Sequence, residues 1–296
     1  MKKQKEIEQK QKRQSDKRQI LNKDMPIDKK GAARMQPYTT DFARVYDILM
    51  DHISYEDWAD YITELFRKHG IDKGLVLELG CGTGNMTRCM AEKGYDMIGI
   101  DSSQEMLSIA RELSDGDQSG ILYLCQDMRE FELYGTVAAV ISVCDSMNYL
   151  LEEEDLLKVF RLVNNYLDPR GLFIFDLDTP YAYEKVLGDT TFAMNREEGS
   201  FLWENTFYPE EMINEVNLTL FVPKTHEGDR ILYEKLEETH VRRAYSVERI
   251  RSLLTEAGME WVAAYHELSE EKPRKDSERV YILAKEKYHP GKLYRQ

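Results

Sequence analysis

The sequence contains few cysteines, and their spacing excludes two common uses of that residue. The 296-residue chain has four cysteines, with no Cys-x-x-Cys pair and no histidine partner at the spacing of a metal site. We therefore expect neither a disulfide framework nor a bound metal. The cysteines are predicted to be small buried side chains of a protein in the reducing cytoplasm. They are Cys81, Cys89, Cys125 and Cys144.

Long apolar runs are also missing. No window approaches the roughly 18 consecutive apolar residues that identify a transmembrane helix. The N-terminus is charged and lacks the apolar stretch of a secretory signal. We expect no membrane-spanning helix and no membrane partner. With 42% hydrophobic residues, the chain can still bury a large core, as one domain with an insertion or as two small domains.

Positive charge is scarce outside the N-terminus. The net charge is −14, yet residues 1–36 hold 12 Lys or Arg against 5 Asp or Glu, which leaves −21 on the rest. An acidic body is a poor non-specific partner for nucleic acid or an anionic membrane. Residues 1–36 are rich in Lys, Gln and Glu and are predicted to be a disordered extension. They are either a spacer or an arm that binds RNA or another partner.

Strand-like and helix-like segments alternate over residues 37–189. Aromatic and aliphatic residues recur at helical spacing over residues 42–65. Short apolar runs then alternate with helical patterns, which is typical of a parallel sheet covered on both faces. The predicted strands are 75–79, 95–101, 121–127, 137–143 and 171–178, and the predicted helices are 85–93, 103–113 and 152–167.

The pattern changes after Pro180. Three segments with period-2 alternation predict an antiparallel insertion of three strands over residues 190–245. The alternation of helix and strand resumes over residues 246–296, where Ser246 can cap a helix and strands are predicted at 261–268 and 279–286. The predicted fold is α/β: a Rossmann-like, doubly wound, mostly parallel seven-stranded sheet with an inserted antiparallel β cap.

Alternating glycines follow the first predicted strand. A dinucleotide-binding turn has the spacing Gly-x-Gly-x-x-Gly, whereas here Gly80, Gly82 and Gly84 occupy every second position. Glu78 before them would repel a phosphate and suits an ammonium group, and Asp101 at the next strand end can accept two ribose hydroxyls. These residues favour a nucleoside with a cationic tail. The alternative is a tight strand-to-helix turn without a ligand.

Four motifs in order resemble those of the class I S-adenosylmethionine-dependent methyltransferases. "ELGCGTG" resembles motif I and "GIDSSQEML" the acidic loop after it, while "QDMRE" and "CDSMNYL" match the family's segments after the third and fourth strands. The resemblance runs from residue 38 to the C-terminus. It is strongest to a bacterial branch often called YqeM-like, which shares "FARVYDILM" and an "ETHVRR"-like strand. The sugar-amine N-methyltransferases are more distant relatives.

The resemblance implies a set of residues that bind S-adenosylmethionine and its product S-adenosylhomocysteine. The glycines would line the methionine and ribose parts, Asp101 would hold the ribose hydroxyls, and Asp127 would bind the adenine amino group. Simpler interpretations exist, because methionines often fill cores and an aspartate after a strand often caps a turn. The implied set is Tyr38, Glu78, Gly80, Cys81, Gly82, Gly84, Asp101, Ser102, Met106, Asp127, Met128 and Cys144.

The resemblance also implies transfer of a methyl group, for which the general-base candidates are Asp145, His240 and Tyr46. Tyr46, with Tyr38, would belong to an N-terminal lid, although it could equally face the core of its helix. The acidic body favours a small-molecule acceptor with an N or O nucleophile. The alternatives are an RNA- or ribosome-associated methyltransferase anchored by residues 1–36 and a cofactor-binding module without catalysis. The β cap could cover the substrate or form a homodimer.

Overall fold

The computed structural model describes residues 47, 54–114, 120–227, 230–288 and 292. The predicted basic extension and nearly all of the predicted lid lie outside these segments. No helix in the described part of the chain is long and apolar enough to cross a membrane.

A seven-stranded sheet forms the core, with strand order β10-β11-β5-β4-β1-β2-β3. β11 is antiparallel to both of its neighbours, and the other strands run parallel to one another. This arrangement confirms the predicted mostly parallel sheet. The strands are β1 (Leu75–Leu79), β2 (Asp96–Asp101), β3 (Leu122–Cys125), β4 (Val137–Ser142), β5 (Leu167–Asp178), β10 (Glu260–His266) and β11 (Arg279–Lys285).

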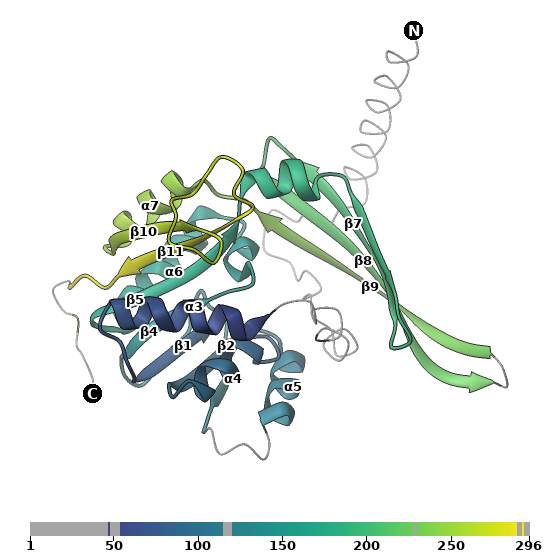
Figure 1. The fold of residues 1–296 in the computed structure, drawn as a ribbon, viewed down its shortest axis with the longest axis horizontal. Helices are drawn as coiled ribbons and strands as arrows, with labels where there is room; N and C mark the ends of the chain where they lie inside the picture. The colour runs from purple at the N-terminus through teal and green to yellow at the C-terminus, as the bar shows by residue number, and fades with distance from the viewer. Residues whose placement is uncertain (1–46, 48–53, 115–119, 228–229, 289–291, 293–296) are drawn as a thin grey trace, which may run out of the picture. The chain divides into compact units, whose positions relative to one another are not determined.

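Helices cover both faces of this sheet (Figure 1). Within β1, Val76 belongs to the same buried cluster as Phe66 of α3, while Leu77 belongs to a second cluster that contains Phe160 of α6. Both strand residues are fully buried, as expected of a central parallel strand that is covered on both faces. The doubly wound prediction is therefore confirmed. The helices are α3 (Tyr55–Lys68), α4 (Asn85–Glu92), α5 (Gln104–Ser114), α6 (Glu153–Tyr166) and α7 (Val247–Glu256).

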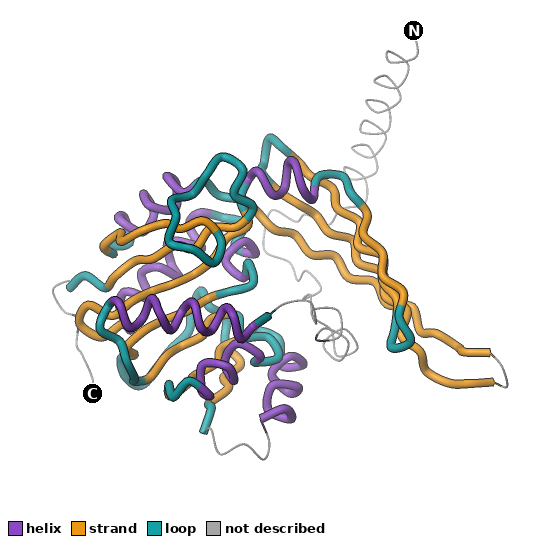
Figure 2. The backbone as a smooth tube through the Cα atoms, viewed as in Figure 1, coloured by secondary structure: helices purple, strands orange, loops and turns teal. Residues whose placement is uncertain are grey.

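A second, antiparallel sheet lies between β5 and α7 in the chain, and its strand order is β6-β7-β8-β9. Figure 2 draws its long strands in orange. Val216 and Leu218 are buried on one of its faces. The sequence predicts three strands here, and that number is wrong. The missed strand is β6, because four of its five residues are exposed and show no alternation of burial. The strands are β6 (Thr191–Asn195), β7 (Ser200–Tyr208), β8 (Ile213–Glu227) and β9 (Arg230–Arg243).

Two short helical turns lie where the core sheet meets the β cap. They are η1 (Ser146–Tyr149), which follows β4, and η2 (Ala182–Leu187), which follows β5. Asn148 of η1 donates hydrogen bonds to the carbonyl oxygens of Asp178 (3.1 Å) and Arg243 (2.8 Å), and its own oxygen accepts the Asp178 amide (3.0 Å). This buried side chain therefore fastens the last residue of β9 to the carboxyl end of β5.

Candidate functional site

The site lies where the strand order of the core sheet reverses, between β1 and β4. Ligands bind in open α/β folds at the carboxyl ends of the strands that flank such a switch. Here Cys144 and Asp145, just after β4, both have left-handed backbones with φ of 60° and 52°. Non-glycine residues pay a strain energy for this conformation, and such strain clusters at functional sites.

The glycine loop, residues 80–84, follows β1 and faces this switch point. All three of its glycines have positive φ, between 53° and 75°, a region that other residues enter only with strain. Packing restricts them as well. A Cβ on Gly80 would lie 2.7 Å from the Ser146 hydroxyl, and one on Gly84 would lie 2.4 Å from the Tyr123 hydroxyl. The loop therefore brings backbone atoms into a place that no side chain could share.

Asp101 ends β2 beside the glycine loop. Its carboxylate accepts one hydrogen bond from the amide of Gly82 (2.8 Å) and one from the amide of Ser103 (2.8 Å). Burial raises the pKa of Asp101, and the backbone amides that bind its carboxylate oppose that rise. The carboxylate is thus fixed in direction, with lone pairs left over for a pair of ligand hydroxyls.

Two methionines pack against the glycine loop. The terminal methyl of Met106 lies 3.2 Å from where a Cβ on Gly82 would be, and that of Met128 lies 3.5 Å from a Cβ on Gly80. Asp127, next to Met128, accepts hydrogen bonds from Arg129 at 2.8 and 2.9 Å. Burial alone would raise the pKa of Asp127, but Arg129 holds it below its ordinary value. The Asp127 carboxylate is therefore charged and already paired.

Glu78 lies beneath the loop, in β1. Its side chain is buried and accepts a hydrogen bond from the Thr87 hydroxyl. Burial raises its pKa to about 8, against the opposing effect of Thr87 and with a further rise from the nearby Asp101. The free protein therefore holds this acid in its neutral form at neutral pH, and a nearby cation would favour ionisation.

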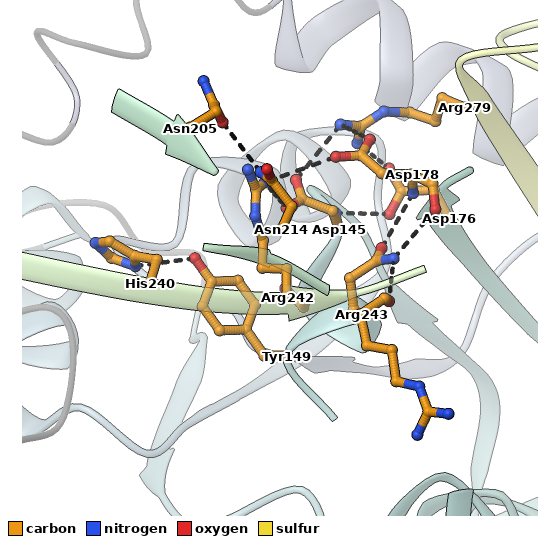
Figure 3. Close-up of polar contacts among 12 residues, drawn as sticks. Asp145, Tyr149, Asp176, Asp178, Asn205, Asn214, His240, Arg242, Arg243 and Arg279 are labelled. Atoms are coloured by element: carbon orange, nitrogen blue, oxygen red, sulfur yellow. Dashed lines mark hydrogen bonds and ion pairs between the residues drawn. The ribbon is translucent and has the colours of Figure 1, made fainter. Parts of the chain in front are cut away.

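An ion-pair cluster joins the β cap to the core (Figure 3). Arg242 of β9 donates to the carboxylate of Asp145, and Arg279 of β11 donates to Asp176 and, at 2.9 Å, to Asp178. The Asp145 amide donates to Asp176 (3.0 Å), which helps to hold its left-handed backbone. Burial raises the pKa of both β5 aspartates, the Arg279 guanidinium opposes that rise, and the neighbouring Asp145 carboxylate adds to it.

His240 lies in the same row of β9 as Arg242, on the buried face of the cap. Its Nδ1 is 3.0 Å from the hydroxyl of Tyr149 in η1, and its Nε2 is 3.4 Å from Glu238. These side chains come from two segments that meet near the carboxyl end of β4, and Figure 3 shows Tyr149 and His240 pointing toward each other. His240 therefore contacts η1, the turn whose first residue follows Asp145.

Comparisons with known proteins decide the family. A methyltransferase-domain model matches residues 76–171. YqeM of Bacillus subtilis (strain 168), described as a methyltransferase, is 34% identical to this chain over 244 residues, which cover 82% of the chain and 95% of that protein. The chain belongs to the class I S-adenosylmethionine-dependent methyltransferases. It falls within their YqeM-like branch, as its four motifs predict.

Two further similarities agree with this family. A solved S-adenosylmethionine-dependent methyltransferase from Clostridium acetobutylicum ATCC 824 has a TM-score of 0.74 at 30% identity, over 83% of this chain and 98% of that one. The dTDP-3-amino-3,4,6-trideoxy-alpha-D-glucopyranose N,N-dimethyltransferase of Streptomyces venezuelae is 29% identical, over 51% of this chain and 62% of that protein. The similarity to the second protein thus spans only part of each chain.

The described residues of the methyltransferase fit its cofactor. The carboxylate of Asp101 is fixed beside the glycine loop, where the ribose hydroxyls would be held. The glycines of the loop have no side chains, so that only backbone atoms would contact the ligand there. Met106 and Met128 supply polarisable apolar surface of the kind that suits a flat ring. Glu78 can ionise in response to a cationic ligand. None of these described residues carries a positive charge that would suit a pyrophosphate.

The other sequence-predicted residues differ in how well the structure places them. Tyr38 and Tyr46 lie outside the described residues. Ser102 is exposed beside Asp101, and Cys81 is buried in the glycine loop. Burial raises the pKa of the Cys144 thiol well above its ordinary value, so Cys144 stays a neutral thiol at the switch point. The individual roles of these residues remain predictions.

Sequence reasoning missed the ion-pair cluster. Asp176 and Asp178 stand in an apolar strand, "GLFIFDLD", and a charge at an otherwise buried position was a visible signal that a partner exists. Arg242 lies in the "ETHVRR" stretch on which the resemblance rests, and Tyr149 lies in "CDSMNYL". Their mutual contacts depend on the insertion folding back over the sheet, which no local pattern encodes.

Proposed function

We propose that this methyltransferase transfers the methyl group to an N or O nucleophile of a small molecule, held between the β cap and the carboxyl ends of β4 and β5. Support comes from Arg242 of the cap, whose guanidinium reaches Asp145 after β4 and lies over the ring of Trp203. The amino-sugar N,N-dimethyltransferase similar to this chain is named for a small-molecule amine.

The hydrogen bond between His240 and Tyr149 carries this proposal. S-Adenosylmethionine supplies an already activated methyl group, so the protein has to orient the nucleophile, exclude water and take up a proton. The Tyr149 hydroxyl and His240 Nδ1 lie 3.0 Å apart where η1 meets β9. His240 can thereby take up the proton that the acceptor loses, relayed through the Tyr149 oxygen.

Asp145, a second candidate for the general base, has a different role in this proposal. Its carboxylate accepts from Arg242 and lies 3.4 Å from Arg279. Both contacts engage carboxylate oxygens that a general base would need for the acceptor's proton. Asp145 instead holds the turn after β4 against the base of the cap.

The RNA- or ribosome-associated alternative rests only on residues 1–36, which lie outside the described part of the chain, and the relatives named above give it no support. Formation of a homodimer through the β cap stays a prediction. Both are open to direct measurement by RNA binding and by the mass of the protein in solution.

The proposal is tested in two steps. Enzyme is incubated with labelled S-adenosylmethionine and separate fractions of cell metabolites and RNA, and label is expected in a small-molecule fraction. With that acceptor, His240→Gln and Tyr149→Phe should each lower kcat by about 100-fold or more, as loss of general-base catalysis does. Cofactor affinity should stay unchanged.

The matched control is Thr239→Val, on the exposed face of the same strand. It should keep full activity. Label found only in RNA would refute the acceptor class, and wild-type kcat in both His240 and Tyr149 variants would refute the relay.

A further inference from the structure

Asp47 reaches the glycine loop from a distant part of the chain. One oxygen of its carboxylate accepts hydrogen bonds from the hydroxyl of Thr83 (2.7 Å) and from the side-chain amide of Asn85 (2.7 Å). The same Asn85 amide lies 3.2 Å from the Thr83 hydroxyl. These three side chains therefore form a closed set of polar contacts, in which the acceptor is a charged oxygen and the bonds are correspondingly strong.

The contact falls at the N-terminus of α4, which lacks local means of capping. Gly84 is the N-cap residue and has no side chain to accept a hydrogen bond, and the first turn of α4 contains no acidic residue. A helix N-terminus carries partial positive charge and is stabilised by a nearby anion. Asp47 supplies that anion from outside the helix. Since dinucleotide folds use this same position for a pyrophosphate, Asp47 also makes the loop unsuited to a phosphate.

The loop is consequently held from two sides. Asp101 binds the Gly82 amide on the sheet side (2.8 Å), and Asp47 binds the next side chain, Thr83, on the other. Arg88 adds a hydrogen bond from its guanidinium to the Thr83 carbonyl (2.8 Å). Gly82 and Gly84 have wide conformational freedom, so fixing Thr83 between them removes most of the alternatives open to the loop.

We propose that Asp47 is a positioning residue for S-adenosylmethionine: through Thr83 and Asn85 it holds the glycine loop in its cofactor-binding shape. The inference rests on the cofactor and is independent of the acceptor and of the His240–Tyr149 relay. A loop that is already in the bound shape loses less conformational entropy when the ligand arrives. Because Asp47 acts through the loop, its loss should lower the binding affinity for S-adenosylmethionine and for S-adenosylhomocysteine by the same factor. This should hold although only S-adenosylmethionine is a sulfonium cation.

The test is calorimetric binding of both ligands to full-length variants. Asp47→Ala removes both hydrogen bonds and should lower the affinity for each ligand by about tenfold. Asp47→Asn keeps an acceptor oxygen without the charge, so the affinity should fall by a smaller factor in this variant. Asn85→Ala should also weaken binding. The Asp47→Ala/Asn85→Ala double variant should lose no more affinity than the single variant with the larger loss, because the two side chains act as one unit.

Asp60→Ala is the matched control. Asp60 is also an aspartate that reaches α4 from an earlier segment, but its partner is Lys93 at the opposite end of that helix, 2.5 Å away. This control should bind both ligands as the wild type does. Wild-type affinity in a folded Asp47→Ala variant would overturn the proposal. A loss of affinity confined to S-adenosylmethionine would also overturn it, because that would indicate a direct charge effect. The same holds if the affinity losses of the two single variants multiply in the double variant.

Discussion

Replacing Glu78 with glutamine should change how the stability of this methyltransferase depends on pH. Glu78 is 2% exposed, and burial raises its pKa from 4.5 to about 8 in the folded protein. The unfolded chain keeps the ordinary value. The folded state therefore binds the proton more tightly, so the stability due to this group is complete below pH 4.5 and is lost as the pH rises through about 8.

The size of the effect follows from the two pKa values. Each pH unit between them costs about 1.4 kcal/mol, which amounts to roughly 5 kcal/mol over the whole interval. That is a large part of the 5–15 kcal/mol typical of a folded domain. Glutamine is permanently neutral and can still accept a hydrogen bond from the Thr87 hydroxyl. The free energy of unfolding of Glu78→Gln should therefore match that of the wild type near pH 5 and exceed it by several kcal/mol above pH 8.

Urea unfolding of both proteins at half-unit steps from pH 5 to 9 measures this difference directly. A fixed difference in unfolding free energy across that range would refute the assignment of a raised pKa.

Cofactor binding tests the protonation of Glu78 independently at pH 7, since an ammonium group near Glu78 would drive its ionisation. The wild type should then release a proton on binding S-adenosylmethionine, seen as a dependence of the calorimetric heat on the ionisation enthalpy of the buffer, and Glu78→Gln should not.

Two further predictions concern the cofactor and the N-terminus. Asp101→Ala should weaken cofactor binding at least tenfold, on the order of 1.4 kcal/mol, because ribose hydrogen bonds are lost; unchanged calorimetric affinity in a folded variant would contradict its role. Deletion of residues 1–34 should leave cofactor affinity intact, and a fall in RNA association in the same variant, measured by filter binding, would favour the RNA alternative over a small-molecule acceptor.

Much of the fold could be predicted from local patterns, because burial leaves a periodic trace in the sequence. The apolar residues at 75–79 predict a strand correctly, because that strand is buried on both faces. The sequence does not reveal β6, because an exposed edge strand has no such periodic trace. The glycine loop and Asp101 were recognisable for a related reason. Positive φ and close backbone approach restrict those positions to residue types that stand out in a sequence.

The contacts between distant segments were decided by the tertiary structure alone. The sequence contains Asp47, Thr83 and Asn85, but nothing local indicates that an aspartate 36 residues upstream would cap α4. Likewise, the pairing of Asp145 with Arg242 and of Tyr149 with His240 requires the inserted sheet to fold back over β4 and β5. Local sequence determines which elements form and which turns need glycine. Which charges meet depends on how those elements pack, because an ion pair can form between any two segments that the fold brings together.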